Sequence, residues 1–345
     1  MATAYGDRWE PVSTLGEGGQ GQTYLVRDST GQLQGYAVLK RLRNYSRIAR
    51  FEHELEAIKT LDHPGVVKLI DSQLSSDPAF LVMEHCAGGA LSASPPFWQD
   101  SPLTAIQIFQ EVCSAAVHAH GRGVIHRDIK PANVFLRGPT GPAVLGDFGL
   151  AFIEGLSPRV TETDEVVGPR TFVAPELEDG RLEDVTPKCD VYSLGKLLYW
   201  LLSGGRIFSR EKHREEQWDL KSRSQESRLG WSNIYMEHVN RLLDLMILLS
   251  PEQRRSAENI LILSKQVSRL IQGQYNPISS TIPQPCTYCG QGIYRLAVKD
   301  DSQVEDFGFL ARGSPDWRIL VCDTCGHVQP FRIKSSQHRE WWDAD

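Results

Sequence analysis

The sequence GVIHRDIKPANVFL at residues 123–136 decides the fold of this chain. It brings a histidine, an arginine, an aspartate, a lysine and an asparagine into one short run. GDFG follows at residues 146–149, and FVAPEL follows at residues 172–177. Three motifs with fixed residues in this order are too specific to arise by chance, so the segments on either side must be consistent with them.

A glycine-rich loop lies far upstream of these motifs. Gly16, Gly18 and Gly21 have the spacing G-x-G-x-x-G between two strand-like stretches, 12–16 and 22–27. Glycine lets a backbone turn tightly and approach phosphate oxygens closely. The same spacing marks dinucleotide-binding folds, in which the loop opens into a helix. Here the loop continues into QTYLV, a second strand, which favours a β-hairpin that covers phosphates.

A lysine at the end of the next strand needs an anionic partner. The apolar strand YAVLK ends in Lys40, and the segment RIARFEHELEAIKTLDHP follows it. We predict that this segment is a helix because it has apolar residues at helical spacing, namely Phe51, Leu55, Ile58 and Leu61. Glu54 and Glu56 are the candidate partners of Lys40 on that helix.

These stretches together resemble a eukaryotic-type protein kinase, over roughly residues 9–270. The resemblance implies an α+β fold with two lobes and a kinase domain at residues 9–272. A small β-rich N-lobe would span about residues 9–83, a hinge about 84–89, and a large helical C-lobe about 90–272.

The resemblance implies a role for each residue of the central motifs. Asp128 would orient the substrate hydroxyl and accept its proton, and Lys130 would contact the γ-phosphate of ATP. Asn133 and Asp147 would hold Mg²⁺, with Mn²⁺ as an alternative ion, because carboxylate and amide oxygens are the ligands that such ions prefer.

The resemblance also implies how ATP is held. Lys40 would contact the α- and β-phosphates and pair with Glu54, which is favoured over Glu56 because HELEAIKTLDHP aligns with the family's helix before a His-Pro turn. The backbones of Glu84 and Cys86 would bind the adenine edge. The predicted ATP contacts are Leu15, Gly16, Gly18, Gly21, Thr23, Val38, Lys40, Met83, Glu84, Cys86 and Phe135.

The residue two positions after the catalytic aspartate bears on the substrate. Lys130 in that position is typical of kinases that act on protein serine and threonine. Pro169 stands where the family has a threonine that touches Asp128 and Lys130, which weakens the prediction of substrate docking. The alternative function is a catalytically weak, kinase-like adaptor that recruits partners through the C-terminal module described next.

A second module is predicted after the kinase-like region. CTYCG at 286–290 is echoed by CDTCG at 322–326, beyond a proline-bearing linker at 273–283. Two Cys-x-x-Cys turns suit one tetrahedral Zn²⁺, and a rubredoxin-type iron site is the chemical rival. We therefore predict a zinc ribbon at residues 284–335, with His327 at its surface. Its expected ligands are Cys286, Cys289, Cys322 and Cys325.

Charge and composition limit the other function classes. The formal net charge is −6, and the tail from residue 273 has more acidic than basic residues, which argues against nucleic-acid binding and against a role as a nucleic-acid regulator. A protein partner of the ribbon is favoured instead. No apolar run approaches membrane-span length, and the seven cysteines, an odd number, predict a reducing, cytoplasmic location.

Overall fold

The computed structural model describes residues 4–18, 21–99, 101–153, 171–177, 185–207, 239, 242–272, 288–289, 294–296, 317–322, 325 and 327–332. The chain divides into two compact units, Met1–Leu261 and Ile262–Asp345. This division falls within helix α7 (Ala257–Ile271), whereas the predicted kinase domain extends to residue 272. The first unit holds two lobes, and the second holds a small sheet.

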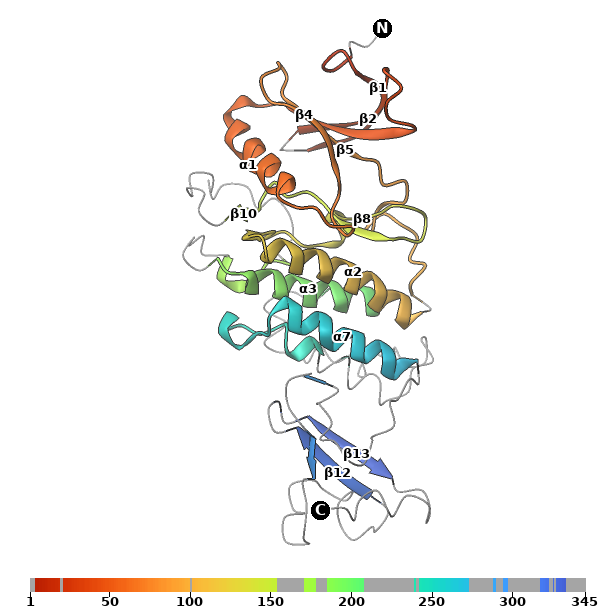
Figure 1. Ribbon diagram of the computed structural model, residues 1–345, viewed down its shortest axis with the longest axis vertical. Helices are drawn as coiled ribbons and strands as arrows, with labels where there is room; N and C mark the ends of the chain where they lie inside the picture. Colours follow the sequence, from red (N-terminus) through yellow and green to blue (C-terminus); the bar gives the residue numbers. More distant parts are fainter. Residues whose placement is uncertain are drawn as a thin grey trace. The chain divides into compact units, whose positions relative to one another are not determined.

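A five-stranded antiparallel sheet forms the N-lobe of the first unit, with the strand order β1-β2-β3-β5-β4 (Figure 1). One helix, α1 (Ile48–Lys59), belongs to this lobe and lies beside the sheet in Figure 1. The strands are β1 (Trp9–Gly18), β2 (Gly21–Asp28), β3 (Tyr36–Leu42), β4 (Leu69–Gln73) and β5 (Phe80–Glu84).

The alternation of side chains along β3 directs Lys40 toward α1. Ala37 and Leu39 belong to an apolar cluster on one face of the sheet. Leu42 lies on the other face and packs with Phe51 of α1. Successive side chains of a strand point to opposite faces, so Lys40 shares the face of Leu42. The pattern of strand and helix therefore sets the lysine against the helix that carries its partner.

The predicted glycine hairpin is present in the structure. Gly18 pairs with Gly21 where β1 meets β2. A Cβ atom at Gly21 would lie 2.3 Å from the carbonyl oxygen of Arg41 on β3, a distance that real Cβ atoms do not adopt. Any side chain there would push β2 away from β3, so the close strand approach requires this glycine.

The C-lobe is built around two helices, α2 (Pro102–His120) and α3 (Pro187–Leu202), which contact each other. Ser101 and Thr186 cap their N-termini by accepting backbone N–H bonds. Short strands complete the lobe, namely β6 (Gly89–Ala90), β7 (Val124–Ile125), β8 (Val134–Leu136), β9 (Ala143–Leu145) and β10 (Phe152–Ile153). The three single cysteines of this unit are buried, namely Cys86, Cys113 and Cys189.

The second unit contains a three-stranded antiparallel sheet in the order β11-β12-β13. Its strands are β11 (Tyr294–Leu296), β12 (Trp317–Cys322) and β13 (Val328–Arg332). The prediction that His327 lies at the surface is wrong, because only 5% of this residue is exposed. Its ring stacks on that of Tyr288, with the ring centroids 4.8 Å apart.

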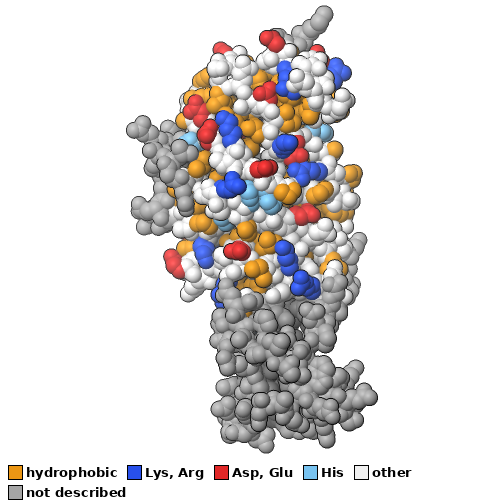
Figure 2. All heavy atoms as spheres, viewed as in Figure 1, with side chains coloured by type: hydrophobic (Ala, Val, Ile, Leu, Met, Phe, Trp, Pro, Cys, Tyr) orange, Lys and Arg blue, Asp and Glu red, His pale blue; other side chains and the backbone are white. Residues whose placement is uncertain are grey.

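The described surface mixes charges of both signs. Figure 2 shows Lys, Arg, Asp and Glu side chains interspersed over the described part of one face. Such a face lacks the clustered cations that phosphate-backbone recognition requires. Among the described residues, no helix combines the length and the apolar character needed to cross a membrane.

Candidate active site

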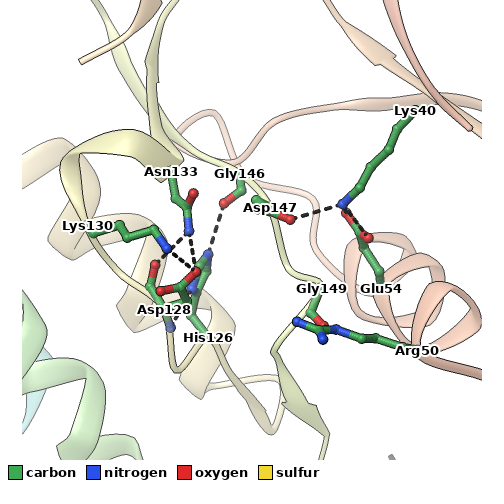
Figure 3. A network of polar contacts seen from close by, with 10 residues as sticks. All are labelled: Lys40, Arg50, Glu54, His126, Asp128, Lys130, Asn133, Gly146, Asp147 and Gly149. Carbon is green, nitrogen blue, oxygen red and sulfur yellow. Dashed lines mark hydrogen bonds and ion pairs between the residues drawn. The ribbon is translucent and has the colours of Figure 1, made fainter. Parts of the chain in front are cut away.

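An ion triad with a buried lysine at its centre joins the two lobes (Figure 3). Lys40 donates from Nζ to both carboxylate oxygens of Glu54, at 2.7 Å each, and to Oδ1 of Asp147 at 3.0 Å. Glu56, the other carboxylate considered, pairs instead with Lys59 on the surface of α1. A strand, a helix and the DFG turn therefore meet at one ammonium group.

Burial and charge act together on the three groups of this triad. Burial alone would lower the pKa of Lys40, but the carboxylates of Asp147 and Glu54 raise it above its ordinary value. Burial raises the pKa of Glu54, and Lys40 only partly offsets this. The Lys40 ammonium holds the pKa of Asp147 below its usual value. Asp147 is therefore an ionised carboxylate at neutral pH, as a cation ligand must be.

A second cluster surrounds Asp128 in the loop between β7 and β8. Lys130 donates to Oδ2 of Asp128 at 2.8 Å, and Asn133 donates from Nδ2 to the same oxygen at 2.8 Å. Asn133 also donates to the backbone carbonyl of Asp128 at 2.8 Å. Because the amide nitrogen makes both contacts, the amide oxygen of Asn133 is the atom suited to hold a cation.

His126 connects the Asp128 cluster to the turn that carries Asp147. Its Nε2 atom donates to the carbonyl of Gly146 at 3.0 Å, and its Nδ1 atom accepts the backbone N–H of Asp128 at 3.2 Å. The carbonyl acceptor requires that the proton is on Nε2. The ring thus fixes the two aspartates on either side of it (Figure 3).

Asp190 of α3 holds the loop that precedes Asp128 in a strained conformation. Arg127 has a φ of 63°, in the left-handed region that side chains rarely adopt. The carboxylate of Asp190 accepts the backbone N–H groups of Arg127 at 2.8 Å and His126 at 2.9 Å, and it also contacts Nε2 of His120 at 2.8 Å. These three contacts on one buried carboxylate hold the strained backbone of Arg127 in place. They thereby fix the position of the next residue, Asp128.

No role for Arg50 in this site was predicted from the sequence. Its Nε atom donates to the carbonyl of Gly149 at 2.7 Å. It lies one helical turn before Glu54, so both side chains occupy one face of α1. The spacing of Arg50 and Glu54 on α1 could have indicated that both side chains face the site. One face of α1 therefore fixes Lys40 through Glu54 and fixes the segment after Asp147 through Arg50.

The predicted adenine contacts lie in one apolar cluster. Cys86 packs with Val67 and Val144, and Met83 and Phe135 pack against this group. Burial raises the pKa of the Cys86 thiol to about 12, so the thiol stays protonated. This cluster joins the end of β5 to the β8–β9 hairpin.

The strands above this cluster carry the other predicted ATP contacts. In the register of the sheet, Thr23 of β2 lies opposite Lys40 of β3, and Val38 of β3 lies opposite Met83 of β5. Leu15 and Gly16 lie on β1, where half of the Leu15 surface is exposed. Pro169 and Cys286 lie outside the described residues.

A buried ion pair between Arg254 and Glu176 holds two segments of the C-lobe together. Arg254 donates from Nη1 to Oε1 of Glu176 at 2.5 Å and from Nη2 to Oε2 at 2.8 Å. Arg254 is 1% exposed, and its guanidinium also donates to the carbonyl of Leu248 at 2.8 Å. The Ala-Pro-Glu motif is thereby tied to the region that precedes α7.

Comparison with known proteins agrees with this geometry. The family described as "Protein kinase domain" matches residues 9–264, most of the chain. The chain therefore belongs to the protein kinase domain family. Its N-lobe sheet and helical C-lobe, described above, are consistent with that family.

Several curated bacterial proteins are similar to this chain. "Serine/threonine-protein kinase Pkn1" of Myxococcus xanthus is 35% identical over 209 residues, covering 58% of this chain and 29% of the relative. "Serine/threonine-protein kinase PrkC" of Bacillus subtilis is 33% identical, with 59% and 32% covered. "Serine/threonine-protein kinase PknB" of Mycobacterium tuberculosis is 34% identical, with 59% and 33% covered. The matched region spans about a third of each relative.

The triad leads to a prediction about the lysine itself. Replacing Glu54 by Gln removes one of the two carboxylates that raise the pKa of Lys40, so this pKa should fall. At a fixed, mildly alkaline pH a larger fraction of the amine is then unprotonated, and acetylation of Lys40, followed by mass spectrometry, should be faster. Glu56→Gln is the matched control and should leave the rate unchanged. An unchanged rate in Glu54→Gln would contradict the triad.

Proposed function

We propose that this chain is an ATP- and Mg²⁺-dependent protein kinase that transfers phosphate to serine and threonine hydroxyls. The observation that carries the proposal is the arrangement of two clusters around one site. Lys40, Glu54 and Asp147 form the first, and Asp128 and its partners form the second. Phosphoryl transfer requires positioning and charge neutralisation, which these groups can supply.

Nucleotide binding would use the ion triad and the adenine cluster. Lys40 would donate to the α- and β-phosphates while Glu54 keeps its ammonium in place. The side chain of Asp147 is 35% exposed, and it would hold Mg²⁺ together with the amide oxygen of Asn133. The bound ion supplies charge neutralisation on the phosphates.

The transfer step would depend on Asp128 and Lys130. The substrate hydroxyl oxygen forms a bond to the γ-phosphorus, and the bond from that phosphorus to the β,γ-bridging oxygen breaks. The hydroxyl proton passes to the carboxylate of Asp128, and ADP leaves with the bridging oxygen. Lys130, 2.8 Å from Asp128 Oδ2, would contact the γ-phosphate as negative charge moves during the transfer.

Two observations favour serine and threonine as acceptors. Lys130 lies two residues after Asp128, the position typical of kinases that act on these residues. The relatives reported above are also named serine/threonine-protein kinases. The substrates would be proteins. The similarity to these kinases lies in the matched region, about a third of each relative.

We also propose that the C-terminal unit binds Zn²⁺ through its two Cys-x-x-Cys turns. Among the described residues no three His, Cys, Asp or Glu side chains form a metal site, but the position of Cys286 is not described. The stack of Tyr288 on His327 supports the proposal. Tyr288 directly precedes Cys289, and His327 is two residues after Cys325, so the stack brings the two turns together.

The ribbon would act as a structural or partner-binding module. A sheet of three short strands can bury little apolar surface, so metal ligation would supply much of its folding free energy. The surplus of acidic residues after residue 273 favours a protein over a nucleic acid as its partner.

The proposed chemistry predicts a sharp loss when Asp128 is changed. Asp128→Asn keeps the size of the side chain but removes the proton acceptor, so the transfer rate should fall about 10²- to 10⁴-fold. ATP affinity should stay at the wild-type value, in contrast to Asp147→Asn, which should lose Mg²⁺-dependent ATP binding. Steady-state kinetics on a peptide and calorimetry with ATP measure both effects. Asp62→Asn, at an exposed position, is the control, and full activity in Asp128→Asn would refute the assigned role.

The proposed metal site predicts zinc in the purified chain of residues 1–345. Elemental analysis should find about one zinc per chain, and Cys322→Ser should abolish it, because three sulfurs hold the ion much less tightly than four. Cys113→Ser is the matched control. Its thiol donates to the carbonyl of Ala257 at 3.4 Å, a contact that a hydroxyl can replace, so zinc content should be unchanged. Wild-type protein that contains no zinc, or contains iron instead, would reject the zinc site.

A further inference from the structure

One guanidinium group, that of Arg137, joins three separate segments of the first unit. Arg137 directly follows β8 and donates from Nε to Oε2 of Glu84 at 2.9 Å and from Nη2 to Oε1 at 2.8 Å. Nη1 also donates to the carbonyl of Pro64 at 2.5 Å, and Nη2 to that of Val66 at 3.5 Å. The C-lobe hairpin, the hinge and the connection from α1 to β4 are thus linked through one side chain.

Glu84 is held through its backbone as well as its side chain. It is the last residue of β5 and pairs with Ala37 of β3. Its backbone N–H donates to the carbonyl of Lys68 at 2.9 Å, and its Oε1 atom accepts the N–H of Lys68 at 2.8 Å. Burial would raise the pKa of Glu84, but hydrogen bonds from Arg137 and Lys68 outweigh it and lower the pKa. The carboxylate is therefore ionised at neutral pH.

The pair differs from an ordinary surface ion pair. Arg27 and Glu10 make a single contact at 3.1 Å with side chains that are 65% and 46% exposed. Such exposed pairs contribute little to stability, because water screens the charges. The side chains of Arg137 and Glu84 are 31% and 22% exposed, and their contact is bidentate. The fork of an arginine fixes direction as well as distance, which a lysine cannot reproduce.

We propose that Arg137 is a positioning residue for the nucleotide base, acting through Glu84. This rests on the proposed function, in which the backbones of Glu84 and Cys86 contact the adenine edge. The carboxylate of Glu84 is held from one side by Arg137 and from the other by the Lys68 N–H. With its side chain fixed in this way, the Glu84 peptide has little freedom to rotate, and its carbonyl stays aimed at the 6-amino group of adenine.

This mechanism makes the effect of Arg137 specific to one edge of the base. Removing the fork should impair the hydrogen bond to the 6-amino group and leave the phosphate contacts of Lys40 and Asp147 unchanged. A nucleotide without that amino group has no such bond to lose. The ratio of the two affinities therefore reports the positioning of Glu84, whereas a general loss of stability would weaken both ligands alike.

The test measures binding of ATP and of purine riboside triphosphate, which lacks the 6-amino group, to the full chain by calorimetry. Arg137→Gln should weaken ATP binding about three- to tenfold, the size of one impaired hydrogen bond. Binding of the analogue should change by much less. At saturating ATP the kcat should remain near wild type, so the defect appears in KM. Arg137→Lys keeps the charge but loses the fork, so its ATP affinity should lie between that of the wild type and that of Arg137→Gln.

Two further variants serve as controls. Lys68→Gln removes a neighbouring positive charge but keeps the backbone N–H that Glu84 accepts, so both affinities should be unchanged. Glu84→Gln should reproduce the selective loss for ATP, and the double variant with Arg137→Gln should lose no more than either single one. Glu84→Gln also decides the question if Arg137→Gln does not fold.

The outcomes separate this inference from the function on which it rests. A selective loss for ATP in Arg137→Gln and Glu84→Gln supports the positioning role. Equal losses for ATP and the analogue, or no loss in either variant, would overturn it while leaving the kinase proposal intact. Wild-type protein that binds neither nucleotide in the presence of Mg²⁺ would overturn both.

Discussion

The ammonium group of Lys40 is the constraint on which the arrangement of this site depends. A charged group removed from water is costly unless opposite charges and hydrogen bonds surround it. The side chain of Lys40 is only 11% exposed, and it meets two carboxylates from different parts of the chain. Because Glu54 lies on α1 and Asp147 lies in the DFG turn, the sheet, the helix and the turn have to come together. Loss of either carboxylate would leave the lysine partly uncompensated.

A second constraint acts in the C-lobe and fixes the reacting groups. Arg127 and Asp147 both have left-handed backbones, with φ values of 63° and 59°, which cost about 1–3 kcal/mol each. Asp190 of α3 holds the backbone of Arg127. His126 links the loop that contains Arg127 to the turn that contains Asp147. The strain is therefore supported by a rigid helix, and the two aspartates proposed for chemistry keep a fixed relation.

The sequence predicted the parts of this site whose residues lie in recognisable motifs. The glycine hairpin and the helix after Lys40 follow from spacing and periodicity, because both are local. Arg137 gave no such signal, since its partner Glu84 is 53 residues away and no periodic pattern links them. His327 was predicted at the surface because four cysteine sulfurs already complete the expected zinc shell. Its stacking partner, Tyr288, belongs to the other Cys-x-x-Cys turn, so no local pattern indicated the contact. The sequence did not predict contacts between distant segments when the residues belong to no recognised motif.

Transfer of the γ-phosphate tests the central claim most directly. The assay contains the whole chain, Mg²⁺, ATP labelled in the γ-phosphate, and a mixture of peptides with serine, threonine and tyrosine. Label transfer by the wild-type chain is compared with label transfer by Lys40→Met. The account predicts label on serine or threonine for the wild type and none for the variant. Wild-type protein that binds ATP but transfers no label, or a variant that transfers as well as the wild type, would contradict it and favour a kinase-like adaptor.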